Sequence, residues 1–196
     1  MSKRSDATRE RLFSAAVDLI GEQGYHGTTV DDIVERAGVA KGTVYYHFSG
    51  KEDLFQAMLT DGLERLSSAF REQVEISADP VDALDGLVRA ELTFIIENQA
   101  FSKLLMSELW RGDRVWREAV VMLREDYVSC VVSVLRRGID SGAFRPDLDP
   151  HWAGPVVFGS VITAALDWLM FQPERPLEEV VVETSALVKH GVWARR

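Results

Sequence analysis

Residues 28–54 read TTVDDIVERAGVAKGTVYYHFSGKEDL, and their pattern predicts two short helices joined by a tight turn. One helical face holds the i, i+3, i+4 and i+7 positions Val30, Ile33, Val34 and Ala37. Thr28 or Thr29 can cap the start of this helix and Gly38 its end. A second short helix is predicted over residues 40–48. The turn between them is typical of a helix-turn-helix, which presents its second helix to a groove of DNA.

The second short helix carries an unusual surface. Its members are Lys41, Gly42, Thr43, Tyr45, Tyr46 and His47. Glycine lets the backbone approach another surface closely. The other side chains supply the donors and apolar contacts that base edges and phosphates need. For Tyr45, packing near Phe48 is as good an interpretation as groove contact.

The flanking segments also follow helical patterns, and no strand-like alternation stands out. A helix is predicted over residues 6–23, with Gly24 as its C-terminal cap. The following helix begins with a capping box in which Ser49 is the N-cap and Glu52 is N3. Further helices are predicted from Asp79-Pro80, over residues 101–110 and 115–141, from Asp149 to Phe171, and to about Trp193. The chain is therefore predicted to be all-α, with about nine helices.

Composition and charge narrow the class of protein. With 46% hydrophobic residues, the 196-residue chain can bury a core. Its single cysteine, Cys130, allows no internal disulfide and is typical of a reducing cytosol, and residues 1–6 lack the apolar stretch of a secretory signal. We therefore expect a cytoplasmic protein.

The net charge of −9 is unevenly distributed. Residues 1–51 hold seven basic and seven acidic side chains, so all the excess negative charge lies beyond them. A polyanion would be repelled by most of the chain and tolerated at the N-terminal end. Charge and pattern together place a domain boundary near residue 50, giving a helix-turn-helix domain over 1–50 and a helical domain over 51–196.

Nothing in the sequence indicates catalysis. The four histidines, His26, His47, His151 and His190, are scattered and lack metal-ligand spacing. No phosphate-cradling glycine loop or nucleophile elbow appears. We expect no catalytic residue, no metal and no cofactor.

The run from Trp152 to Phe171 is the most apolar part of the chain. Its Pro155, Gly159 and Asp167 disfavour a membrane span, so we interpret it as a buried or interface helix and expect no membrane partner. Its apolar content exceeds the need of one small domain, which indicates a two-fold homodimer. The predicted interface residues are Val157, Val161, Leu166, Asp167 and Met170.

Residues 28–54 closely resemble the signature of the TetR (tetracycline-repressor) family of transcription regulators, and the match extends from about Arg9 to Leu59. The match is specific because the apolar, glycine, aromatic and lysine positions of the signature all occur here together. The rest of the chain matches only in architecture, as an all-helical ligand-binding and dimerisation region.

The resemblance implies roles for individual residues. Those implied to contact bases in the major groove are Lys41, Gly42, Thr43, Tyr45 and Tyr46. Those implied to contact phosphates are Thr28, Thr29, His47 and Lys51, the last from a helix start where the dipole favours an anion. Lys3 and Arg4 are either a mobile arm near the DNA backbone or a polar tail.

The resemblance also points to a small-molecule pocket in the C-terminal domain. The large apolar side chains expected to line it are Leu63, Phe70, Leu92, Phe94, Leu105, Leu109, Trp110, Trp116, Met122 and Tyr127. Ordinary core packing is the competing interpretation for each of them. Such a pocket suits a hydrophobic or amphipathic effector, for which a fatty-acyl thioester is one version.

Taken together, the sequence predicts a dimeric regulator that binds a palindromic operator in double-stranded DNA and releases it when a small molecule binds. Two alternatives remain open. One is an activator, or a regulator that needs a co-repressor, with the same fold. The other is a helical small-molecule-binding protein without DNA binding.

Overall fold

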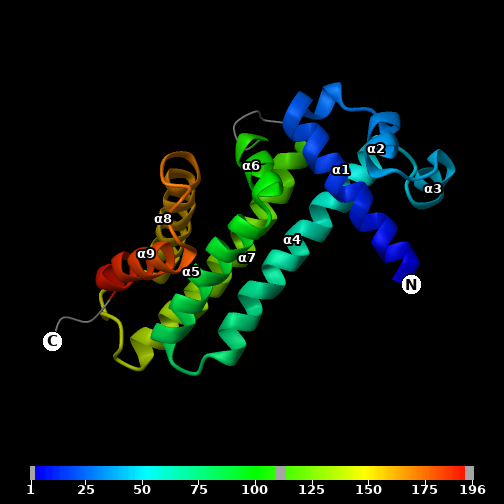
Figure 1. Ribbon diagram of the computed structural model, residues 1–196. Coiled ribbons are helices and arrows are strands. Elements are labelled where there is room, and N and C mark those ends of the chain that lie inside the picture. The colour runs from blue at the N-terminus through cyan, green and yellow to red at the C-terminus, as the bar shows by residue number, and fades with distance from the viewer. Residues whose placement is uncertain (1–2, 109–113, 193–196) are drawn as a thin grey trace. The chain divides into compact units, whose positions relative to one another are not determined.

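The computed structural model in Figure 1 describes residues 3–108 and 114–192. Of these, the side chains of 3–5, 106–108, 114–117 and 119–120 are not described. The predicted all-α fold is confirmed, because the described residues form helices and no β-strand. The helices are α1 (Lys3–Gly27), α2 (Val30–Ala37), α3 (Lys41–His47), α4 (Lys51–Ile76), α5 (Pro80–Glu97), α6 (Gln99–Glu108), α7 (Arg114–Asp140), α8 (Pro150–Phe171) and α9 (Leu177–Val192).

The chain divides into two compact units, of residues 1–63 with 98–120 and of residues 64–97 with 121–196. The long helices α4 and α7 each contribute to both units. Helix α6 belongs to the first unit because it packs against α1. This division differs from the single boundary near residue 50 that the charge pattern suggests.

In the first unit, α2 packs against α1 and α3 follows α2 after a tight turn (Figure 1). The side chains that hold these helices together are buried, and they include Leu12, Ala16, Ile33, Val44 and Phe48. The rings of Phe13 and Phe48 lie 6.0 Å apart, centroid to centroid. The apolar spacing in residues 30–37 thus predicts the buried face of α2 correctly.

The helix ends show which local signals are used. Thr29 is the N-cap of α2, where its hydroxyl accepts a hydrogen bond from the Asp32 amide and the Asp32 carboxylate accepts one from the Thr29 amide. Gly38 ends α2 with φ 61°, a left-handed conformation that favours glycine.

The capping box predicted at α4 is wrong in its acid. The Ser49 amide and hydroxyl both donate to Asp53, at 2.8 and 3.0 Å, in place of the predicted exchange with Glu52. Because α4 begins at Lys51, one residue later than a Ser49 N-cap requires, the reciprocal acid also shifts by one residue.

In the second unit, α5 packs against α8 and α9, and α8 also packs against α9. Arg137 caps the C-terminal end of α4 by donating hydrogen bonds to the backbone oxygens of Val74, Ser77 and Ala78. Carbonyl groups at a helix C-terminus lack a donor from their own helix, and the guanidinium supplies one. Two ion pairs join α5 to α9, between Arg89 and Glu178 and between Lys189 and Asp85. Asp149 and Pro150 begin α8 as predicted, with Asp149 as N-cap.

Candidate nucleic-acid interface

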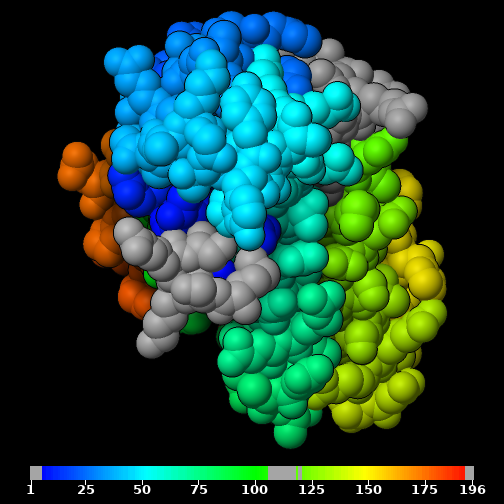
Figure 2. All heavy atoms as spheres, turned by 90° about the vertical axis from the view of Figure 1, so that its right-hand side faces the viewer, coloured from blue at the N-terminus to red at the C-terminus, as the bar shows by residue number. Residues whose placement is uncertain are grey.

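Helix α3 has a buried anchor and an exposed outer surface. Val44 is fully buried, whereas Tyr45 is 53% and Tyr46 85% exposed. A Cβ built on Gly42 would meet nothing within 4 Å, so another surface can approach the backbone there. The sky-blue and cyan atoms of α2, α3 and the start of α4 form a continuous exposed face in Figure 2. For Tyr45, the exposure favours contact with a partner over packing.

Lys41 is held by an acid from the preceding helix. Its Nζ lies 2.7 Å from Oδ1 and 2.8 Å from Oδ2 of Asp31. The hydrogen bond and the charge of Asp31 raise the pKa of Lys41, so the ammonium stays charged. The sequence analysis did not find this pair, because α2 and α3 bring the two residues together only through the angle of their turn.

Lys51 is held by an aromatic ring instead of an acid. Its Nζ lies 4.2 Å from the ring centroid of Tyr25, a cation–π distance, and the Tyr25 ring in turn lies 4.7 Å from that of Phe55. Partial burial lowers the pKa of Lys51. The two lysines predicted to contact DNA are thus oriented by neighbours before any ligand binds.

The remaining predicted phosphate contacts fare differently. The side chain of Thr29 is exposed but already serves as the N-cap of α2. His47 is half-buried and its ring stacks edge-on against Tyr46, with centroids 5.0 Å apart. Thr28 is 1% exposed and its hydroxyl donates to the Gly24 oxygen at 3.0 Å. The prediction for the Thr28 side chain is therefore wrong, because its hydroxyl is enclosed and occupied.

Arg11 positions the helix-turn-helix from α1, a role that sequence reasoning missed. Its guanidinium donates to the backbone oxygens of Ala37 and Gly38, the latter at 2.9 Å. These oxygens lie at the C-terminal end of α2, where a cation also complements the helix dipole. Arg11 thus fixes the turn that sets the direction of α3. An arginine on the α1 surface gives no sequence signal for such a contact.

The second unit holds a polar pair in its apolar core. Glu91 is 2% exposed and Tyr127 is fully buried, among the aromatic rings of Phe70 and Phe158. Tyr127 Oη and Glu91 Oε2 form no hydrogen bond of standard geometry among the described residues, but the two side chains lie close enough for the Tyr127 hydroxyl to oppose part of the rise in the pKa of Glu91. Burial raises the pKa of Glu91 to about 8 and that of Tyr127 well above its usual value. The carboxyl is therefore largely protonated at neutral pH.

Sequence reasoning missed Glu91, although a signal was present. Leu84, Leu87, Val88, Glu91 and Ile95 follow the spacing of one buried face of α5, so an acid at this place interrupts a core pattern. Buried groups that lack partners cost stability and often mark functional sites.

The predicted pocket residues are spread over both units. Leu63 and Leu105 are buried in the first unit; Phe70, Leu92 and Tyr127 are buried in the second, where Phe94 is half-buried. Leu109 and Trp110, and the side chain of Trp116, lie outside the described residues.

Met122 is 66% exposed, which contradicts its prediction as a wall of an enclosed pocket. The buried face of α7 contains Leu123, Tyr127, Val131, Val134 and Leu135. Met122 is one residue away from this face, so its side chain points about 100° aside. Cys130 is half-buried, and burial raises the pKa of its thiol, as expected for an unreactive cysteine.

Comparison with known proteins covers both parts of the chain. Residues 12–58 match the protein-family model described as bacterial regulatory proteins, tetR family. Residues 80–152 match a second family model, described as a tetracyclin repressor-like C-terminal domain. The transcriptional repressor KstR2 of Mycobacterium tuberculosis is 32% identical over 145 residues, covering 74% of this chain and 72% of its own.

The chain belongs to the TetR family. It is therefore a helix-turn-helix regulator of transcription and not an enzyme, as predicted. The fatty acid metabolism regulator protein of Bacillus subtilis is 25% identical over 160 residues, covering 82% of each chain. A putative fatty acid metabolism regulator of Clostridium perfringens has a solved structure with a TM-score of 0.83 at 29% identity, covering 94% of this chain and all of its own.

Homodimers are typical of the TetR family, and α8 presents a face suited to one. Exposed positions recur along α8 at alternating intervals of four and three residues, the spacing of a helix–helix seam. They are Trp152, Val156, Gly159, Thr163, Leu166 and Met170. A Cβ at Gly159 would meet nothing within 4 Å, so a second helix can approach closely there. Val182 and Leu187 of α9 are exposed as well.

Two predicted interface residues are wrong. Val157 is 5% and Val161 0% exposed, because they lie on the opposite face of α8, with Gly154, Ala165 and Trp168, toward the core of the same chain. The prediction failed because α8 is apolar on nearly every side, so the sequence does not distinguish its inner and outer faces. Leu166, Asp167 and Met170 are exposed as an interface requires.

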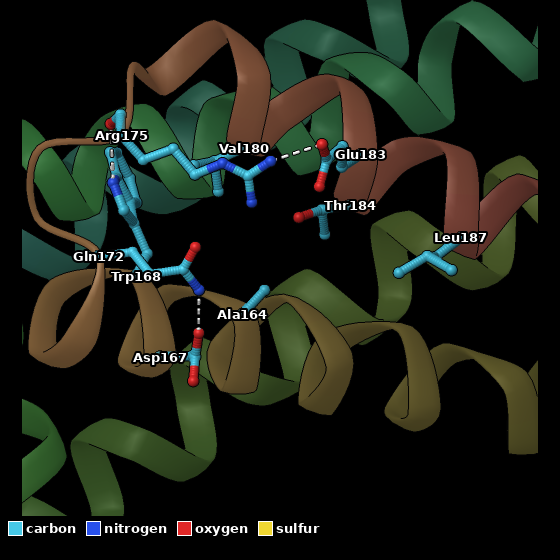
Figure 3. Close-up of a pocket in the computed structure, with 9 residues that line it drawn as sticks. All are labelled: Ala164, Asp167, Trp168, Gln172, Arg175, Val180, Glu183, Thr184 and Leu187. Atoms are coloured by element: carbon cyan, nitrogen blue, oxygen red, sulfur yellow. Dashed lines mark hydrogen bonds and ion pairs between the residues drawn. The ribbon is translucent and has the colours of Figure 1, made fainter.

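Asp167 borders a hollow of about 160 Å³ between α8 and α9 (Figure 3). It accepts a hydrogen bond from Gln172 at 2.6 Å, and Arg175, which also lines the hollow, pairs with Glu183. The acid that the sequence analysis singled out on this helix thus has a partner within the chain.

Two further observations bear on site chemistry. The residues that the structure describes contain no group of three or more histidine, cysteine or acidic side chains able to hold a metal ion. Helix α8 is long and apolar enough to cross a membrane by length and composition, although core helices of soluble proteins meet the same criterion.

Proposed function

We propose that this TetR family protein is a homodimeric repressor that binds a palindromic operator and leaves it when a hydrophobic or amphipathic effector binds. In such a dimer the two α3 helices enter successive major grooves about 34 Å apart. Thr43, Tyr45 and Tyr46 would contact base edges, and Lys41 would reach guanine or phosphate oxygens.

The observation that carries this proposal is the exposed surface of α3 and the start of α4. Tyr46 is 85% exposed on a helix whose Val44 is fully buried, so the helix is firmly seated while its outer side chains lack cover. An uncovered aromatic beside exposed lysine is unfavourable in water and suits a groove of DNA. Lys51 would contact phosphate from the first turn of α4, where backbone amides also favour an anion.

The effector that we propose is a long-chain acyl thioester. Two relatives are named as regulators of fatty acid metabolism, one at 25% and one at 29% identity. The proposed binding region is the apolar core around Phe70, Leu92 and Tyr127 in the second unit. Release requires that the effector bind the DNA-incompetent arrangement more tightly, and DNA must then weaken effector binding by the same factor.

The proposed dimer interface is the exposed stripe of α8 with Val182 and Leu187 of α9, where apolar area otherwise faces water. A dimer also matches the two-fold symmetry of a palindromic operator. A DNA-binding regulator of this family acts where the chromosome is, so we propose a cytoplasmic location.

The experiment that tests the function starts with selection of bound duplexes from random DNA at physiological salt, followed by anisotropy titration on the selected sequence. We expect a palindrome bound in the nanomolar range. Stearoyl-CoA, stearate and coenzyme A alone would then be added to the complex. If stearoyl-CoA releases the DNA and the other two do not, the result supports a thioester effector. If none of the three releases the DNA, the thioester proposal is rejected. If the protein binds DNA without sequence preference, the operator proposal is rejected.

A further inference from the structure

The ion pair between Asp31 and Lys41 places a negative charge on the proposed DNA-binding face. Both side chains are exposed, at 62% and 58%, and both carboxylate oxygens lie within 2.8 Å of Nζ. Asp31 is on α2 and Lys41 is the first residue of α3, so the pair spans the turn of the helix-turn-helix.

Stability accounts for this acid only in part, because Asp31 lies in the first turn of α2, where an exposed carboxylate gains modestly from the helix dipole. The N-terminus of α2 is already capped by the reciprocal hydrogen bonds of Thr29 and Asp32. An exposed ion pair contributes little to folding, because water and salt screen it and two long side chains must be ordered. An acid facing DNA also repels phosphates, so Asp31 lowers affinity for any duplex unless it serves another purpose.

We propose that Asp31 determines specificity by competing with DNA for Lys41. This inference rests on the proposed function. On a non-operator duplex, Lys41 must leave Asp31 to contact a phosphate. The phosphate contact is only slightly more favourable than the lost ion pair, so the net gain in binding free energy is small. On the operator, α3 is seated in the groove and Lys41 reaches a base edge whose contacts exceed those of the carboxylate. Asp31 therefore weakens non-specific binding more than operator binding.

The test is a double-mutant cycle in the full-length protein with D31N, K41M and the double variant. E35Q is the matched control, because Glu35 is exposed on the same helix and takes part in no ion pair within the described part of the chain. Each variant is titrated by anisotropy on the selected operator and on a scrambled duplex, across a range of salt concentrations. Thermal unfolding verifies that all variants remain folded.

We expect D31N to raise affinity for the scrambled duplex several-fold and to steepen its salt dependence by about one unit of log–log slope, since one more lysine reaches phosphate. Operator affinity should rise less, so the specificity ratio falls. In the K41M background the same substitution should raise affinity much less, because only the direct repulsion between Asp31 and the phosphates is then removed.

Two results would overturn the inference. Equal effects of D31N and E35Q would mean that only net charge matters, and an undiminished effect of D31N without Lys41 would mean that Asp31 acts by another route. Both comparisons are possible on the scrambled duplex alone. Failure of this inference can therefore be distinguished from failure of the proposed function, which is rejected if the wild-type protein selects no DNA sequence.

Discussion

The two units differ in the polar side chains that bear on their proposed roles. On the proposed DNA-binding face of the first unit, Lys41 and Asp31 are exposed and paired. The second unit also has exposed ion pairs, but its core encloses Glu91 and Tyr127, which form no hydrogen bond of standard geometry among the described residues. A paired, exposed group costs little to hold in place, whereas a buried group without a partner costs stability.

This difference matches two modes of recognition. DNA presents the same phosphates and base edges to every regulator, so a surface with preset donors can meet it directly. A small molecule enters the interior, where a polar group that lacks a partner in the free protein can gain one from the ligand. The comparison predicts that substitutions in the second unit change stability most and those in the first unit change DNA binding most.

The largest expected effect concerns Glu91. Its pKa rises from about 4.5 in the unfolded chain to about 8 in the core, so the folded state retains the proton longer. Wild-type stability therefore falls as pH rises through this window, by about 1.4 kcal/mol per pH unit, and levels off above it. Glu91→Gln has the same shape and no proton to lose.

Urea unfolding of wild type and Glu91→Gln at pH 5, 6.5 and 8 measures this effect. The stability of the variant relative to wild type should increase with pH, because the Glu91 carboxyl of wild type loses its proton in the unfolded chain and keeps it in the folded core, whereas glutamine has no such proton. A difference that stays constant over this range would show that Glu91 titrates normally, and the contrast between the two units would lose its main support.

A smaller effect is expected at Thr43, which lies half-buried on α3 and belongs to the proposed base-contacting set. Thr43→Ala should change base preference at one operator position and cost roughly 1–3 kcal/mol there. Repeating the selection from random DNA with the variant measures this directly. An identical selected motif would remove Thr43 from the base-contacting set, and an equal loss on every sequence would reassign it to phosphate.

A loss of about 1 kcal/mol in stability is expected from Thr29→Ala, because the N-cap of α2 loses its side-chain oxygen. Thr60→Ala is the control, since Thr60 is an exposed threonine within α4 whose hydroxyl donates to the Gln56 oxygen of the same helix. Urea unfolding should separate the two variants. If both lose the same stability, the capping box contributes nothing beyond an ordinary surface threonine.

The sequence predicts local features of both units and few of their long-range contacts. The periodicity of residues 30–37, a threonine cap at position 28 or 29 and the turn at Gly38 all follow from neighbours within four residues, and the structure confirms them with Thr29 as the cap. The outer face of α8 does not follow, because apolar side chains surround that helix. The contacts of Arg11 with Ala37 and of Lys41 with Asp31 depend on how separate helices meet, which no spacing encodes.

The smallest expected effect distinguishes the charge of Lys51 from its orientation. Lys51→Ala removes a proposed phosphate contact, so it should weaken binding to all sequences and lower the salt slope by about 1. Tyr25→Leu leaves the charge but removes the ring that lies 4.2 Å from Nζ. It should weaken binding only a few-fold and leave the slope unchanged, because the lysine still releases a counterion when it reaches phosphate.

Tyr25→Phe is the matched control, since it retains the ring face and its contact with Phe55, and should bind like wild type. Salt titrations of the three variants on one duplex separate the two roles. If Tyr25→Leu lowers the slope as much as Lys51→Ala does, the ring is required for the phosphate contact itself, and Lys51 is then functional only when held in place. If neither variant changes the slope, Lys51 does not contact phosphate, and the α4 start would no longer belong to the proposed DNA-binding face.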